Sequence, residues 1–412
     1  MDNNDYHNIY QKKIFFAIGK ELKDKKVNIL DGFTGTGTFI VRLIQSGLLD
    51  GNLTHKYKSE LHANEITLLA YYIANLNIAA AYHQALGTSD ADSYLMPPKL
   101  LLTDTFEMEE TKDWMPALED EILGENKENR KAQRNTPIDV IIGNPPYSAQ
   151  QKSANDNNKN TEYPALFKKI AESYAKESTA TNKNSLYDSY KLAIRWASDR
   201  IEHNGIIGYV TNSSFIDGNS DDGLRACLEK EFSYIYVLNL RGNQRTQGEE
   251  SRKEGGKIFG GGSRTPVAIT LLIKDENYKE EKAEISYFDI GDYLSREQKL
   301  NILNHLHDIS KVDFTRIIPN KLNDWIGQRD ESFDALVLIG SKEKGNKEQT
   351  IFESVYFREL EGARDNWIYN FDKNTLAKNM DNTIDIYNQE CEKYIGNKDY
   401  SKLINRNPKE IS

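Results

Sequence analysis

Hydrophobic residues in the first two-thirds of the chain occur in short runs, and most of these runs alternate with longer amphipathic stretches. Short continuous apolar runs are typical of strands buried on both faces, whereas apolar positions three or four apart are typical of helices. Seven runs are strand-like: residues 27–30, 60–63, 100–103, 138–143, 205–211, 234–240 and 266–273. Their alternation with helical stretches predicts a doubly wound α/β sheet. The last two runs lack a clear helix between them, so we expect an antiparallel pair at one edge.

The polar stretches complete this outline. Residues 9–23 have the spacing of an amphipathic helix, and Ser295 with Gln298 forms a capping box that opens a helix over 296–306. Three polar segments without periodicity are expected to be loops: residues 123–136, 148–160 and 241–264. Beyond about residue 280 the pattern becomes irregular. We therefore expect an α/β domain over 1–280 and a smaller region over 281–412.

Composition narrows the class of protein. The chain has 412 residues, 38% of them hydrophobic, which is enough for packed cores. No apolar run is long enough for a membrane span, and the polar N-terminus has no signal-peptide pattern. Two distant cysteines and seven histidines form no disulfide framework or metal cluster, so we predict no metal and a reducing, cytoplasmic setting. The net charge of −10 argues weakly against a protein that coats nucleic acid indiscriminately.

A glycine-rich motif, DGFTGTGTF at residues 31–39, follows the first strand and opens a helix. Gly35 and Gly37 allow the backbone to approach a ligand closely, and the helix N-terminus offers free N–H groups. The motif lacks the Gly-Lys-Ser/Thr of a Walker loop, and Ile40 stands where the dinucleotide fingerprint requires glycine. The motif predicts a nucleotide-type site, and a tight turn without a ligand is the alternative.

Acidic residues follow the next two strands. Glu65 comes just after the second strand, where a carboxylate can accept hydrogen bonds from both hydroxyls of a ribose. Asp104 and Thr105 follow the third strand, where a carboxylate could accept from an adenine amino group. The alternatives are a solvated surface residue for Glu65 and a helix N-cap for Asp104.

The tetrapeptide Asn144-Pro145-Pro146-Tyr147 follows the fourth strand directly. Two prolines stiffen the backbone and remove two donors, which leaves the Asn144 side-chain oxygen and the Pro145 carbonyl as acceptors beside an aromatic ring. Two such acceptors can hold a planar amine, favour a pyramidal nitrogen and direct its lone pair at an electrophile. A proline-stiffened loop without catalytic function is the alternative.

Taken in order, these motifs resemble those of S-adenosylmethionine-dependent amino-methyltransferases, and NPPY is typical of their N6-adenine DNA branch. The chain is more similar still to the methyltransferase part of single-chain Type ISP restriction–modification enzymes. Stretches that carry this resemblance are LLTDTFE (101–107), VIIGNPPYS (140–148), YDSYKLAIRWASDRI (187–201), GIIGYVTNSSFIDG (205–218), VLNLRGN (237–243), REQKL (296–300) and RDNWIYNF (364–371). The implied fold is a class I methyltransferase Rossmann-like sheet of seven strands, the last one antiparallel. The domains would be a methyltransferase over 1–280, and a connector with a partial target-recognition region over 281–412.

The resemblance also implies roles by position. S-adenosylmethionine would be bound by Asp31, Phe33, Gly35, Gly37, Glu65, Asp104 and Thr105, with Glu65 on the ribose and Asp104 on the adenine ring. The catalytic residues would be Asn144, Pro145, Pro146 and Tyr147, with Tyr147 stacking on a target base flipped out of the duplex. The implied activity is methyl transfer to the exocyclic amine of adenine in double-stranded DNA, as the modification part of a restriction–modification system.

Three features depart from the family pattern. Gly32 stands where relatives more often have proline, and no Tyr-Thr-Pro segment precedes the first strand. Family members are also longer, so we expect helicase, nuclease and further recognition parts to lie on a longer or separate chain.

The loop 241–264 is the candidate for phosphate contact with DNA. The contacts would be made by Arg241, Arg245, Arg252 and Arg264, and a solvated loop without such contacts is the alternative.

Two other functions remain open. NPPY also serves methylation of protein glutamine and of guanine in RNA, because each acceptor is a planar amine. The chain could instead be a catalytically idle DNA-binding remnant, which should not bind S-adenosylmethionine.

Overall fold

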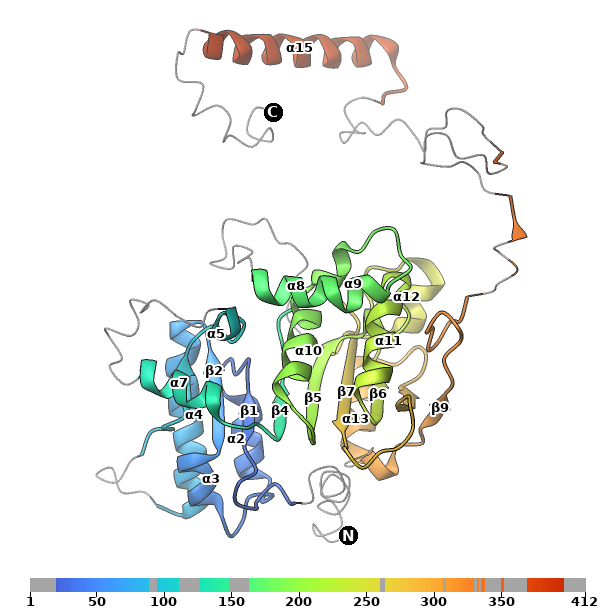
Figure 1. The fold of residues 1–412 in the computed structure, drawn as a ribbon. Helices are drawn as coiled ribbons and strands as arrows, with labels where there is room; N and C mark the ends of the chain where they lie inside the picture. Colours follow the sequence, from blue (N-terminus) through green and yellow to red (C-terminus); the bar gives the residue numbers. More distant parts are fainter. Residues whose placement is uncertain are drawn as a thin grey trace. The chain divides into compact units, whose positions relative to one another are not determined.

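The computed structural model describes residues 20–88, 95–110, 126–147, 163–259, 264–306, 309–329, 332, 335–337, 350–351 and 369–395. One nine-stranded sheet, with strand order β3-β2-β1-β4-β5-β7-β6-β8-β9, organises most of these residues (Figure 1). Its strands are β1 (Ile29–Asp31), β2 (Leu61–Glu65), β3 (Leu100–Leu102), β4 (Val140–Gly143), β5 (Gly205–Asn212), β6 (Tyr234–Asn239), β7 (Val267–Lys274), β8 (Glu284–Asp289) and β9 (Thr315–Ile317).

The strand pairing confirms the expected doubly wound sheet and extends it. β1 to β5 are mutually parallel, and β7 is antiparallel to both β5 and β6. All seven predicted strands are present, and β7 runs antiparallel as expected. The expected antiparallel pair, β6 and β7, is confirmed, but it does not lie at an edge and the sheet has nine strands instead of seven. The reason is that β8 pairs in parallel with β6 along its whole length and β9 pairs with β8.

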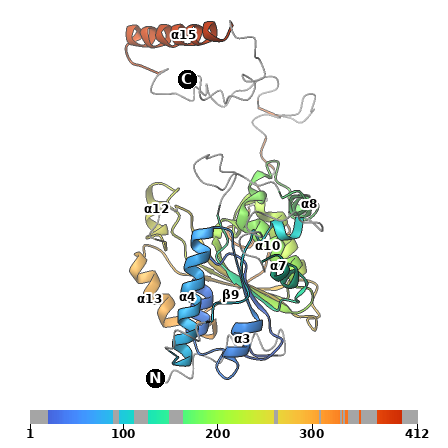
Figure 2. The ribbon, with the colours of Figure 1, turned by 90° about the vertical axis from the view of Figure 1, so that its left-hand side faces the viewer.

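Helices cover both faces of the sheet (Figure 2). α2 (Thr38–Gln45), α3 (Leu53–Ser59), α4 (Leu68–Leu86) and α13 (Arg296–Leu306) pack on one face. α8 (Pro164–Glu172), α9 (Tyr174–Glu177), α10 (Ser189–Arg200) and α11 (Asp222–Glu231) pack on the other. The remaining helices of the described residues are α5 (Glu107–Glu110), α7 (Asn126–Asn135), α12 (Gly248–Glu254) and α15 (Lys373–Ile395). The two-sided cover explains why the strands read as continuous apolar runs.

Several polar segments differ from the sequence prediction. Residues 126–135 of the expected loop 123–136 form α7, which buries Arg130 and Gln133. The expected loop 241–264 contains α12. Residues 20–23 of the expected helix 9–23 form bends and turns, whereas residues 9–19 and 148–160 lie outside the described part. The capping box of α13 is confirmed, because Ser295 N–H donates to Gln298 Oε1 at 2.8 Å and Gln298 N–H to Ser295 Oγ at 3.3 Å.

The chain divides into two compact units, residues 1–329 and 330–412. The expected boundary at residue 280 lies too early, because β8 and β9 belong to the sheet of the first unit. The role of 281–412 as a connector and partial target-recognition region stays a prediction. No helix in the described residues is long and apolar enough to cross a membrane.

Candidate active site at the carboxyl edge of the sheet

The loops that follow β1 and β4 meet where the strand order reverses. The chain passes from β1 outward to β2 and β3 and then returns to β4 on the other side of β1. Open α/β sheets bind ligands in the crevice outside such a switch point. A Cβ built on Gly143, the last residue of β4, would lie 3.0 Å from Asp31 Oδ1 at the end of β1. The glycine-rich turn and the Asn144–Tyr147 loop are therefore close neighbours.

Both glycines of the turn adopt conformations that other residues rarely take, but their surroundings differ. Gly35 has φ +56°, and nothing lies within 4 Å of a Cβ built on it. Gly37 has φ +89°, and its Cβ would lie 3.0 Å from Ile78 Cγ1 on α4. Open space beside Gly35 suits a ligand, whereas Gly37 permits close packing of α2 on α4. Both remain predicted cofactor contacts.

Glu65 ties the glycine-rich turn to β2. Its carboxylate accepts hydrogen bonds from the N–H groups of Gly35 at 2.8 Å and Thr67 at 2.7 Å. Each carboxylate oxygen retains capacity for a further donor, such as a ribose hydroxyl. The next residue, Ile66, is 56% exposed, although large apolar side chains are usually buried. Sequence reasoning missed Ile66, whose signal is an apolar residue directly after the acid that ends β2.

Asp104 and Thr105 have structural partners. Asp104 Oδ1 accepts from Phe106 N–H at 2.9 Å, and Oδ2 accepts from the Tyr163 hydroxyl at 2.7 Å. The N-cap alternative is therefore realised, and an adenine amine would share this carboxylate with Tyr163. Thr105 Oγ1 donates to the Gly32 carbonyl at 2.6 Å, which fixes the glycine-rich turn from the side of β3.

An aromatic cluster packs around Phe33 of the glycine-rich turn. The half-buried Phe33 ring lies 5.3 Å from Phe106, 6.2 Å from Trp196 and 6.3 Å from Tyr209, measured between ring centroids. A Cβ built on Gly32 would lie 3.3 Å from the Trp196 ring. Trp196, on α10, therefore lies directly beside this position, and a larger residue at Gly32 would press on its ring. Sequence reasoning did not identify Trp196 as a support of the turn.

The four residues after β4 alternate in exposure. Asn144 and Pro146 are exposed, Pro145 is buried and Tyr147 is half-buried. The Tyr147 hydroxyl lies 2.5 Å from Asn144 Oδ1 and 3.0 Å from the Val210 carbonyl. A hydroxyl has one hydrogen, so these two bonds are alternatives. Burial raises the pKa of Tyr147, which keeps the hydroxyl a donor. The Asn144 oxygen can still accept a second hydrogen, because an amide oxygen has two lone pairs.

The four candidate DNA-binding arginines differ in their surroundings. Arg241 forms ion pairs with Asp289, at 2.6 Å, and with Asp292. Its charge is therefore already balanced by carboxylates, and the structure does not favour it as a phosphate contact. Arg245 and Arg264 are exposed on two antiparallel segments joined by the hydrogen bond from Gln244 N–H to the Arg264 carbonyl. Arg252 is exposed on α12 beside Glu249 at 3.4 Å.

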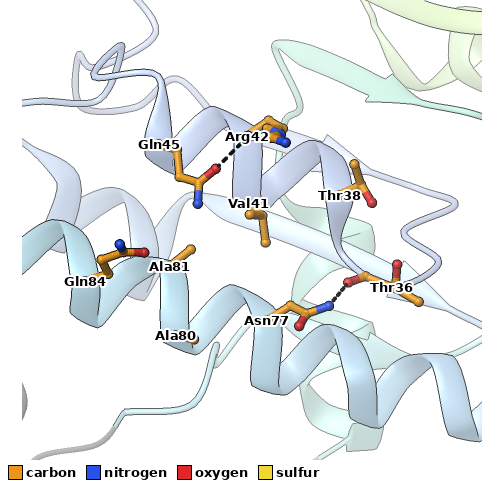
Figure 3. Close-up of a pocket in the computed structure, with 9 residues that line it drawn as sticks. All are labelled: Thr36, Thr38, Val41, Arg42, Gln45, Asn77, Ala80, Ala81 and Gln84. Carbon is orange, nitrogen blue, oxygen red and sulfur yellow. Dashed lines mark hydrogen bonds between the residues drawn. The ribbon is translucent and has the colours of Figure 1, made fainter.

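A separate groove of about 370 Å³ lies between α2 and α4 (Figure 3). Thr36, Arg42, Asn77 and Gln84 are among its lining residues, and the predicted catalytic and cofactor residues are not. Asn77 Nδ2 donates to the Thr36 carbonyl at 2.9 Å, which ties α4 to the glycine-rich turn. The groove therefore lies outside the proposed active site.

Comparisons with known proteins agree with this geometry. Residues 59–245 match the family model described as Eco57I restriction-modification methylase. The Type II restriction enzyme and methyltransferase RM.Eco57I of Escherichia coli is 24% identical over 240 residues, which are 57% of this chain and 21% of that protein. The residues matched by the family model, 59–245, include β4 and the Asn144–Tyr147 loop.

Two solved structures of Type ISP restriction–modification enzymes are more similar. A nuclease-deletion mutant of LlaGI in complex with a DNA substrate mimic is 46% identical, with a TM-score of 0.82, and the match covers 95% of this chain and 31% of that chain. LlaBIII bound to DNA is 42% identical, with a TM-score of 0.83, and the match covers 97% of this chain and 26% of that chain. This chain thus spans less than a third of the length of these three relatives.

Proposed function

Because this chain has the class I methyltransferase fold and resembles the methyltransferase part of Type ISP restriction–modification enzymes, we propose that it methylates the exocyclic amine of adenine in DNA. Methyl transfer would serve as the modification part of a restriction–modification system in the bacterial cytoplasm. The observation that carries this proposal is the position of the Asn144–Tyr147 loop beside the glycine-rich turn at the β1/β4 switch point.

Asn144 and Pro145 would act on the target amine. The amine of adenine is a poor nucleophile because its lone pair is delocalised into the ring. The Asn144 side-chain oxygen and the Pro145 carbonyl would accept its two hydrogens and favour a pyramidal nitrogen. These acceptors would stabilise the positive charge that develops on nitrogen in the transition state. The nitrogen would then lose a proton to water, and the Tyr147 ring would stack on the base.

The residues of the glycine-rich turn and the ends of β2 and β3 would bind the cofactor. S-adenosylmethionine supplies an electrophilic methyl group on a sulfonium. Glu65 would accept from the ribose hydroxyls, and the exposed side chain of Ile66 offers an apolar surface to the adenine ring. Asp104 would accept from the adenine amine, next to Tyr163.

DNA would approach the same edge of the sheet. β6 ends and β7 begins at this edge, so the segment with Arg245 and Arg264 lies on the same side of the sheet as Asn144. The structures of LlaGI in complex with a DNA substrate mimic and of LlaBIII bound to DNA support DNA as the partner. The target adenine would have to leave the stack, because an amine inside a duplex cannot reach such a site.

Methyl incorporation tests the proposal. The full chain is incubated with S-adenosylmethionine labelled in its methyl group and with unmodified duplex DNA of mixed sequence, and the labelled base is identified. We expect label on adenine, loss of label with Asn144→Ala, and unchanged label with Lys230→Gln, an exposed residue at the opposite edge of the sheet. Parallel incubations contain RNA or protein instead of DNA. Label in one of these, with none on DNA, would mean that the acceptor is RNA or protein and not DNA. Failure to bind S-adenosylmethionine would favour the idle remnant.

A further inference from the structure

The side chain of Asp31 lies fully buried at the centre of the proposed site. Asp31 ends β1, and its Oδ1 accepts from the Phe33 N–H at 3.1 Å. Its Oδ2 has no hydrogen-bond partner among the described residues. Buried polar atoms are almost always paired, so an unpaired carboxylate oxygen next to a proposed ligand site requires an explanation.

The groups around this carboxyl include no cation among the described residues. Glu65 faces it from β2, and the Tyr209 phenol faces it from β5. The Tyr209 hydroxyl is also buried without a partner in the described structure. Gly143 lies beside the other oxygen, since a Cβ there would lie 3.0 Å from Asp31 Oδ1 and 3.7 Å from Tyr209 Cε1.

A buried carboxylate without a cation is unstable in its charged form. Burial raises the pKa of Asp31 to about 7; the Phe33 N–H opposes this shift, and the negative charge of Glu65 adds to it. In the free protein this carboxyl therefore holds its proton under slightly acidic conditions. A ligand that brings a positively charged donor to Oδ2 would reverse the balance in favour of the carboxylate.

The amino-acid end of S-adenosylmethionine carries such a donor, an α-ammonium group. We propose that Asp31 couples cofactor binding to proton release, because the α-ammonium group of the cofactor displaces the proton of this carboxyl. The inference rests on the proposed function, since it concerns the same cofactor. In the balanced step, neutral Asp31 loses one proton to solvent, and the resulting carboxylate pairs with the ammonium group.

The sign of the pH dependence follows from the raised pKa. Below pH 7 the free protein carries the proton that binding must expel, so affinity falls as pH falls. Well below pH 7 each further pH unit should weaken binding about tenfold. Because half of the carboxyl groups are already protonated at pH 7, the loss of affinity between pH 7 and pH 5.5 is about fifteenfold. The α-amino group of the ligand titrates near pH 8, so it stays charged over this interval.

Calorimetry on the full chain measures the proton directly. S-adenosylmethionine is titrated at pH 6 in two buffers with different ionisation enthalpies, and the difference in heat gives the number of protons released. We expect about one proton for S-adenosylmethionine and for S-adenosylhomocysteine, and none for methylthioadenosine, which lacks the amino-acid part. Equal heats in the two buffers would overturn the inference and leave the proposed cofactor intact, whereas absence of any binding would overturn the proposed function.

Two variants assign the proton to a residue. Asp31→Asn keeps the acceptor for Phe33 N–H but cannot ionise, so its affinity should not change between pH 5.5 and 7. Glu65→Gln should bind the cofactor more weakly at every pH and still release the proton, with its midpoint at lower pH because a negative neighbour is lost. Proton release that persists in Asp31→Asn, or that disappears in Glu65→Gln, would refute the assignment to Asp31.

Discussion

Alanine at the two positions of the glycine-rich turn, Gly35 and Gly37, should impair different properties of the protein. Gly37→Ala places a Cβ 3.0 Å from Ile78 Cγ1 in a residue with φ +89°. The left-handed backbone costs about 1–2 kcal/mol and the overpacking about 1–3 kcal/mol. Gly35→Ala has the same backbone cost at φ +56°, but its Cβ enters open space. We therefore expect Gly37→Ala to be the less stable variant by about 1–3 kcal/mol.

Thermal unfolding followed by circular dichroism measures this difference, which corresponds to roughly 2–5 °C in Tm for a unit of this size. Cofactor binding should show the reverse order. The Gly35 Cβ occupies the space that a ligand would use, so Gly35→Ala should weaken S-adenosylmethionine binding at least tenfold, about 1.4 kcal/mol. Equal Tm values for the two variants would refute the packing role of Gly37. Unchanged affinity in Gly35→Ala would remove the open side of the turn from the cofactor site.

Further variants test the remaining site residues. Tyr147→Phe keeps the aromatic ring and removes a hydroxyl that has two alternative acceptors. The methylation rate should therefore stay within about tenfold of the wild-type rate. A loss of activity as complete as in Asn144→Ala would assign the hydroxyl a catalytic role. Glu65→Ala should weaken cofactor binding before it affects DNA binding, because it removes the acceptor of the Gly35 N–H, and the two dissociation constants separate these effects. Charge reversal at Arg245 and Arg264 should reduce the slope of log K for DNA binding against log salt concentration by about 2 in magnitude. Arg241→Gln should leave this slope unchanged, because Arg241 is already paired with carboxylates. A flatter slope in Arg241→Gln would mean that Arg241 leaves its carboxylate partners and contacts DNA.

Local patterns in the sequence identified most of the fold. The strands are short apolar runs, and a run buried on both faces needs no knowledge of its neighbours to be recognised. The α13 capping box also depends on residues three positions apart, and its bonds form as predicted. Helix α7 was missed because nine of its ten residues are polar and show no apolar face. Its buried residues include Arg130 and Gln133, which the sequence pattern gave no reason to place in the interior.

The order of strands could not be read from local patterns. β7 lies between β5 and β6, so the predicted antiparallel pair is internal, and β8 continues the sheet beyond the expected boundary at residue 280. Backbone hydrogen bonds between strands carry no side-chain signature that would identify the partner. The irregular sequence after residue 280 therefore concealed two strands that complete the first unit.

The sequence by itself determined which residues are candidates for chemistry, because Gly35, Glu65 and Asn144 each follow a recognisable strand. Tertiary structure alone decided what each candidate touches. It paired Arg241 with two aspartates, and it buried Asp31 beside Gly143 and Tyr209, with no cation next to it among the residues that the structure describes. The physical reason is that charge and desolvation depend on atoms within a few ångströms, and in this sheet those atoms come from strands that are distant in the sequence.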